Sequence, residues 1–142
     1  MTSAGYSPRP ERLSLQRKLV LSVEILLAYA RARRVLGRRS LPEVVAAMRG
    51  KRTERYAPRE GADATGLQLA GAVTRVLGAL PQDPRCLTSA LVLTSLLARR
   101  GIAVKLVIGV RLDPFAAHAW VEHGGRPLLP PATAPFKRLV EV

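Results

Sequence analysis

The chain has a single cysteine, Cys86, and its two histidines are His118 and His123. A cysteine thiolate is a strong nucleophile, and it usually works with a histidine that the fold brings in from elsewhere in the chain. Cys86 follows Pro84-Arg85 at the expected start of a helix, where backbone N–H groups and the helix dipole favour thiolate over thiol. Arg85 adds a nearby cation. These residues predict nucleophilic cysteine chemistry, whereas a lone cysteine is more commonly a small buried apolar residue.

His118 opens an expected strand whose side chains alternate between two faces. His118, Trp120 and Glu122 share one face, and Ala119 and Val121 share the other. If the sheet packs on the helix that begins at Cys86, the imidazole can reach the thiol. The alternative is that this histidine has a purely structural role.

The elements around these residues predict an α+β fold, with helices first and a small antiparallel sheet after them. Apolar residues at three- and four-residue spacing predict helices over about 13–36, 41–49, 63–80 and 86–100. Ser40 and Glu43 form a capping-box pattern before the second helix, and Gly101 is the expected cap of the fourth. The fourth helix is apolar nearly all round, so it should be central and buried.

After Gly101 the pattern changes to that of strands, predicted over residues 104–110, 118–122 and 127–129. His123-Gly124-Gly125-Arg126 is typical of a hairpin turn, in which His123 is most simply a solvated side chain. Residues 1–12 are expected to form an arm and residues 51–61 a loop. We interpret residues 1–142 as one domain, with a basic helical part over 1–60 and a catalytic core over 61–142.

The net charge of +13 is uneven, with +9 on residues 1–60 and +4 on residues 61–142. Such a field attracts an anionic partner, whether nucleic acid, an anionic membrane surface or an acidic protein. The simplest alternative is a solvated, arginine-rich helix face. The sequence has no glycine-rich phosphate loop and no recognised nucleic-acid motif, so we expect no nucleic-acid partner.

Localisation and metal binding follow from what the sequence lacks. The apolar stretch 19–30 contains Glu24 and is shorter than the ~20 residues of a membrane span, so no stable membrane insertion is expected. No signal peptide is apparent, and a single cysteine suits a reducing, cytoplasmic location. One cysteine and two histidines form no metal-ligand cluster, so no metal is expected.

Residues 84–127 resemble the transglutaminase-like cysteine peptidase of lasso-peptide biosynthesis, the leader-peptidase half of the B protein. The helical N-terminal part is similar to that family only in length and character. The order of a helix-start cysteine, a strand and a strand-borne histidine is also similar to that of papain-like enzymes. The matching motifs are Cys86-Leu87, ARRGI at Ala98–Ile102, IGVR at Ile108–Arg111 and HAWVE at His118–Glu122.

The resemblance implies a leader peptidase with Cys86 as nucleophile and His118 as base. It implies no cofactor, and its partners would be the precursor peptide, a small leader-recognition protein and an ATP-dependent cyclase. The family usually has an Asp about twelve residues after the histidine, where this chain has Pro130. Glu122 is roughly 13 Å along the strand from His118, which is too far for a hydrogen bond. Asp113, a backbone or side-chain oxygen, or a two-residue dyad are the remaining possibilities.

Some features of the reaction stay open at this point. The backbone N–H of Cys86 is the expected first oxyanion donor, and Gln82 is a candidate for the second. Two alternative functions are also compatible with this sequence. One is transfer of the acyl group to an amine instead of water. The other is a non-catalytic module whose basic helices bind a partner protein or nucleic acid.

Overall fold

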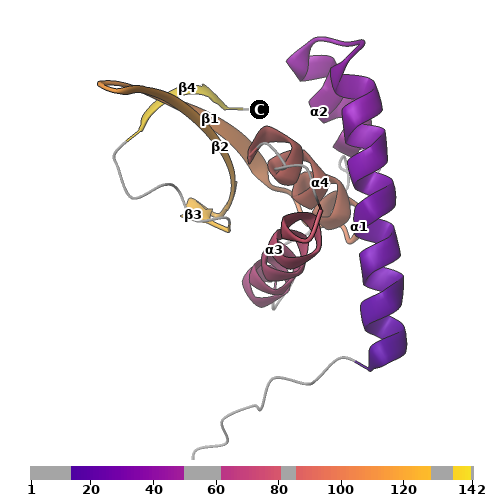
Figure 1. Ribbon diagram of the computed structural model, residues 1–142. Coiled ribbons are helices and arrows are strands. Elements are labelled where there is room, and N and C mark those ends of the chain that lie inside the picture. Colours follow the sequence, from indigo (N-terminus) through magenta and orange to yellow (C-terminus); the bar gives the residue numbers. More distant parts are fainter. Residues whose placement is uncertain (1–13, 50–61, 81–85, 129–135, 142) are drawn as a thin grey trace, which may run out of the picture.

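The computed structural model describes residues 14–49, 62–80, 86–128 and 136–141, and within them it confirms the α+β fold (Figure 1). The strands form an antiparallel sheet in the order β3-β2-β1-β4. The predicted arm over 1–12 and loop over 51–61 lie outside the described residues. The elements are α1 (Leu15–Leu36), α2 (Leu41–Arg49), α3 (Ala62–Gly78), α4 (Cys86–Arg99), β1 (Lys105–Leu112), β2 (Phe115–His123), β3 (Arg126–Pro127) and β4 (Lys137–Glu141).

Local hydrogen bonds at the helix ends confirm the predicted signals. The backbone N–H of Ser40 donates to the Glu43 carboxylate at 3.0 Å, which is one half of a capping box. Gly101 has φ of +73°, and the N–H of Ile102 donates to the carbonyl of Leu97 at 2.9 Å. A left-handed glycine at this position satisfies the last carbonyls of α4 and turns the chain toward β1.

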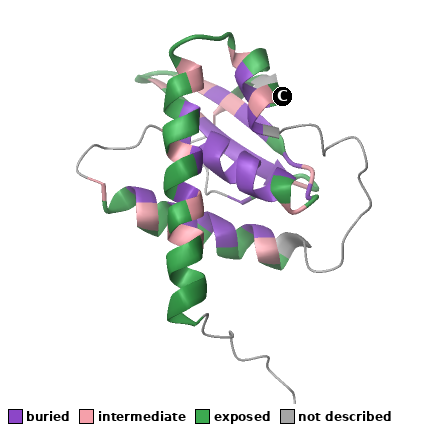
Figure 2. Cartoon of the chain, turned by 90° about the vertical axis from the view of Figure 1, so that its right-hand side faces the viewer, coloured by how far each residue is buried: buried purple, intermediate pink, exposed green. Residues whose placement is uncertain are grey.

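Helix α4 lies at the centre of the molecule, as its all-round apolar pattern predicts. Helix α1 crosses one side of it and the sheet lies on the other (Figures 1 and 2). Every residue from Ala90 to Ala98 is buried. The residues that pack around α4 come from helices and strands alike: Ile25, Ala28 and Ala32 of α1, Val44, Val45 and Met48 of α2, Leu69, Val73 and Leu77 of α3, and Leu106, Ala119 and Val121 of the sheet.

The two faces of the sheet are both covered. Ala119 and Val121 belong to the core around α4. On the opposite face Val107 and Trp120 are also buried, with 0% and 5% of their surface exposed. Strand β2 alternates as predicted, but its His118 face is turned away from α4.

Three parts of the sheet differ from the sequence prediction. Strand β2 begins at Phe115, because its pairing with β1 extends to Leu112 and Phe115, so His118 lies inside the strand and does not open it. The third strand is Arg126–Pro127 and joins β2 through Gly124 and Gly125, with φ of +57° and +80°, as the hairpin signal predicts. Strand β4 was not predicted at all. It pairs with β1 across a register shift between Ile108 and Gly109.

Ion pairs fasten β4 to the rest of the sheet. Arg138 lies 2.8 Å from Glu122 on β2 and 2.7 Å from Glu141 on its own strand, and Lys105 on β1 lies 3.9 Å from Glu141. The hydrogen bond from Arg138 lowers the pKa of Glu141 below its ordinary value of 4.5. The same bond, with Glu122, raises the pKa of Arg138. The ionised carboxylate of Glu141 therefore helps to hold this edge strand.

This linkage predicts a small, pH-dependent loss of stability. A depressed carboxylate pKa stabilises the folded state above the unfolded pKa, and that contribution disappears as the pH falls through the folded value. We expect wild type to melt above Glu141→Gln at pH 7, and the two melting curves to converge below about pH 4. A thermal melting series from pH 7 to pH 3 checks this, and a gap that widens toward acid would contradict it.

Candidate active site

Cys86 is the first residue of α4 and is half-buried, which confirms its predicted place at the helix start. Its Sγ accepts a hydrogen bond from the backbone N–H of Ala119 at 3.4 Å. A nearby N–H donor and the positive end of the helix dipole both favour the thiolate form of a cysteine.

The thiol reaches the sheet at a stretch of the β2 edge that no described strand pairs with. Along a strand, alternate residues direct their N–H and C=O groups to the same edge. The Val121 carbonyl accepts a hydrogen bond from the N–H of Leu128, which follows β3. The backbone N–H and C=O groups of Val121 and Ala119 therefore both point toward β3. Strand β3 pairs only with Glu122 and His123. The N–H of Ala119 therefore lies beyond the end of β3, and the Cys86 thiol satisfies it.

This contact brings the predicted nucleophile to the backbone next to the predicted base. The Ala119 N–H belongs to the peptide bond that joins it to His118, so the thiol lies against the backbone of His118. The packing differs from the expectation in one respect: α4 covers the Ala119 face of the sheet, and Cys86 meets β2 at its edge.

The His118 imidazole packs against two aromatic rings on the other face. Its centroid lies 6.0 Å from that of Trp120, with the planes 19° apart, and 5.7 Å from that of Phe136, with the planes 38° apart. Its Nε2 atom is buried, and within the described residues it has no hydrogen-bond partner. Buried polar atoms are nearly always paired, so the orphaned nitrogen marks a place where a partner is expected.

The acidic residues considered from the sequence do not supply that partner. Glu122 accepts the Trp120 Nε1–H at 2.8 Å and pairs with both guanidinium nitrogens of Arg138, at 2.8 and 3.1 Å. Asp113 is exposed in the turn between β1 and β2. Among the described residues no carboxylate contacts His118. Pro130, at the family's usual Asp position, lies outside the described ranges, as do Gln82 and Arg85.

Three residues that shape this site were not found from the sequence. Phe136 and Arg138 approach only through the unpredicted strand β4. Gly109 lies opposite His118 in the sheet register, and its lack of a side chain lets Trp120 and Phe136 approach it closely. The IGVR motif contains this glycine, but nothing in the motif shows which rings approach it.

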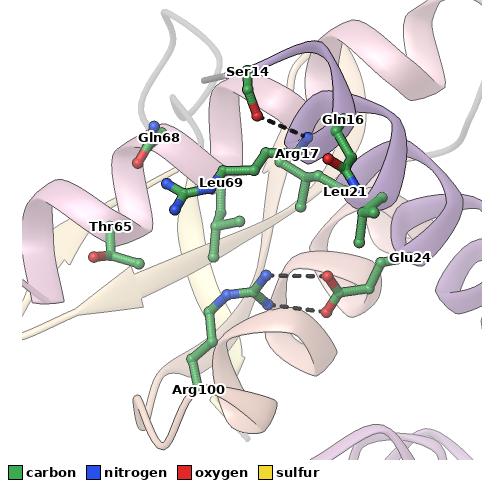
Figure 3. Close-up of a pocket in the computed structure, with 10 residues that line it drawn as sticks. Ser14, Gln16, Arg17, Leu21, Glu24, Thr65, Gln68, Leu69 and Arg100 are labelled. Carbon is green, nitrogen blue, oxygen red and sulfur yellow. Dashed lines mark hydrogen bonds and ion pairs between the residues drawn. The ribbon is translucent and has the colours of Figure 1, made fainter. Parts of the chain in front are cut away.

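A cavity lies away from these residues, between α1 and α3 (Figure 3). It has a volume of about 510 Å³, and at its edge Arg100 makes paired hydrogen bonds of 3.0 and 3.1 Å to the Glu24 carboxylate. Arg100 follows the C-terminal end of α4 and Cys86 begins that helix, so the two are roughly 20 Å apart by helical rise. The cavity is therefore a separate feature from the cysteine and histidine.

The described residues contain neither a group of metal ligands nor a helix that could span a membrane. No group of three or more His, Cys, Asp or Glu residues there is arranged to hold a metal ion. Among the helices of those ranges, none combines the length and the apolar character that crossing a membrane requires.

Residues 19–141 match the family model described as the transglutaminase-like superfamily. A segment of 41 residues, 29% of this chain, is 51% identical to the Microcin J25-processing protein McjB of Escherichia coli. The segment covers 20% of that protein. The match thus spans about a fifth of the length of that curated relative. No solved structure matches the chain significantly.

Proposed function

This chain belongs to the transglutaminase-like superfamily, and from that premise we propose that it is a cysteine peptidase with Cys86 as nucleophile and His118 as base. The observation that supports this most directly is the 3.4 Å contact between the Cys86 thiol and the N–H of Ala119, next to His118. This contact brings a thiol at the start of a helix to the backbone next to His118, which supports the two residues as a pair.

We propose that the substrate is a lasso-peptide precursor and that the bond cleaved joins its leader to its core. Two similarities support this choice. Residues 84–127 resemble the lasso leader peptidases, and the relative from E. coli is named as a processing protein. The released core would pass to an ATP-dependent cyclase. The reaction is placed in the cytoplasm, where a free thiol stays reduced.

In the proposed mechanism, the Cys86 thiolate attacks the carbonyl carbon of the scissile amide. The C–N bond then breaks as His118 protonates the departing amine of the core, and the leader remains as a thioester on sulfur. His118 next takes a proton from water, which attacks the thioester, breaks the C–S bond and releases the leader carboxylate. The backbone N–H of Cys86 is the donor we propose for the oxyanion, because the N–H groups in the first turn of a helix have no partner within that helix.

A mass measurement tests both the reaction and its alternative. The protein is incubated with a precursor peptide and a leader-recognition protein, and Cys86→Ala serves as the control. Hydrolysis gives a leader with a free carboxylate. Transfer to an added amine gives a leader amide, heavier than the free acid by the mass of the amine less one water, which would favour the acyl-transfer function. An intact precursor under conditions where Cys86→Ala and wild type behave alike would contradict both.

The outer face of α1 supports a protein partner over nucleic acid. Ile25, Ala28 and Ala32 point inward, yet the opposite side of the same helix is also apolar. A helix with two apolar faces buries only one of them within its own domain, so the other is available to a partner. The exposed apolar residues are Leu15, Leu19, Val20, Val23, Leu26 and Leu27, between 40% and 79% exposed, and exposed cations lie near both ends, at Arg17, Lys18, Arg33 and Arg34.

We therefore propose that α1 docks the leader-recognition protein. These six exposed apolar residues form a stripe along α1 with cations at both of its ends. The cations would repel a second copy of α1, whether it packed parallel or antiparallel, and they favour a partner whose apolar surface is bordered by carboxylates. The cavity of Figure 3 adjoins the stripe, since Val20 belongs to both. A nucleic-acid site would instead be expected to present cations with little apolar surface.

A paired substitution tests this surface. Leu19→Glu with Leu27→Glu places charge on two leucines that are 67% and 65% exposed, so the fold should persist while affinity for the leader-recognition protein falls roughly tenfold or more. Leu139→Glu on β4, where the leucine is 66% exposed, is the matched control and should bind as wild type does. Titration calorimetry gives the affinities, and equal losses in both variants would rule out a specific role for α1.

A further inference from the structure

We propose that Trp120 and Phe136 position the His118 imidazole in place of the acidic residue that the family usually supplies. The inference rests on the proposed function, because it concerns how the base of that reaction is held. Trp120 and Phe136 are positioning residues in this account, since they act through His118.

The first observation is that no hydrogen bond from the described residues holds the buried Nε2 end of this imidazole. Nε2 is buried and has no partner among the described residues, and the acid on the same strand face, Glu122, is engaged by Trp120 and Arg138. In a triad, a hydrogen bond from the third residue fixes the rotation and the tautomer of the imidazole. The described part of this site shows no such bond.

The second observation is that the ring is held by packing. His118 is nearly parallel to Trp120, at 19°, and tilted by 38° to Phe136, with centroid separations of 6.0 and 5.7 Å. These separations fall within the range of attractive aromatic pairs. Contacts from two neighbouring rings restrict rotation of the imidazole without bringing a negative charge to it.

The third observation is that both contacting rings are themselves fixed. The Trp120 indole is 5% exposed and donates its Nε1–H to Glu122 at 2.8 Å. The Arg111 guanidinium lies 5.5 Å from the centroid of the Phe136 ring. Gly109, opposite His118 on β1, leaves the space that both neighbours occupy. The two rings therefore come from β2 and from the residue just before β4, and both pack against Gly109 of β1.

The test uses the single cysteine as its own reporter. The probe is iodoacetamide, and the readout is the rate of Cys86 alkylation from pH 4 to pH 9, which follows the thiolate formed with His118. Phe136→Leu keeps an apolar side chain but removes the ring. We expect the alkylation rate near pH 6 to fall roughly 2- to 10-fold, the effect of losing one aromatic pair. Phe136→Tyr keeps the ring and should retain the wild-type rate.

The chain offers a matched control, because its other phenylalanine is Phe115, 73% exposed at the start of β2. Phe115→Leu should leave the alkylation profile unchanged. A second readout is the proton NMR spectrum of the two histidines, in which the His118 ring signals should move toward unperturbed positions only in Phe136→Leu. If Phe136→Leu does not fold, Phe136→Met replaces it with a flexible side chain of similar size.

The outcomes separate this inference from the proposed function. If His118→Ala leaves the alkylation profile of Cys86 unchanged, the proposed catalytic pair is wrong. If His118→Ala suppresses alkylation near pH 6 while Phe136→Leu changes neither that rate nor the His118 ring signals, the pair stands and the aromatic positioning is overturned.

Discussion

Replacing Cys86 with alanine is expected to stop leader release, and replacing His118 with alanine should slow it by about 10³-fold or more. Cys86 supplies the only thiol in the chain, so no other side chain can form the thioester. In the proposed mechanism His118 both protonates the leaving amine and activates water, so its loss should affect two steps and be correspondingly severe. Single-turnover cleavage of the precursor, followed by mass spectrometry, measures both effects.

The control for His118 is the second histidine. His123 ends β2 in the hairpin turn, five positions further along the chain, and His123→Ala should keep the cleavage rate within about twofold. The double variant Cys86→Ala with His118→Ala should be no slower than Cys86→Ala alone, because residues that act as one unit are not additive. A His118→Ala protein that cleaves at the wild-type rate would exclude His118 as the base.

Patterns that lie within single elements could be predicted from the sequence. The central helix was predicted from apolar residues on every side of it, and its buried stretch from Ala90 to Ala98 confirms this. The capping pair Ser40 and Glu43 and the left-handed Gly101 are likewise local signals. Such features depend on neighbours a few residues away, which the sequence displays directly.

Features that depend on distant pairing could not be predicted. Strand β4 has the sequence Lys137–Glu141, a short charged run that favours no element by itself, and it becomes a strand by pairing with β1. Phe136 and Arg138 reach the candidate site only through that pairing. The face of β2 that α4 would cover was also undetermined, since either face carries apolar residues and alternation alone does not choose between them.

Gly109 lies where strand β1 has no room for a side chain. A Cβ built there would lie 2.8 Å from Cβ of Phe136 and 2.8 Å from two ring carbons of Trp120. Carbon atoms do not approach so closely without a shift. The Phe136 atom is joined directly to the backbone, and the Trp120 ring is buried and hydrogen-bonded to Glu122, so neither can yield easily.

Gly109→Ala is therefore expected to lower the free energy of unfolding by about 1–3 kcal/mol, the usual cost of overpacking, as measured by urea denaturation. Gly71→Ala is the matched control: the glycine is exposed on α3, an added Cβ meets nothing within 4 Å, and the change should stabilise by up to ~1 kcal/mol. Because the displaced rings are those that contact His118, Gly109→Ala should also slow Cys86 alkylation near pH 6, whereas Gly71→Ala should not. A Gly109→Ala protein as stable and as reactive as wild type would mean that the rings can move away without disturbing either β1 or the imidazole.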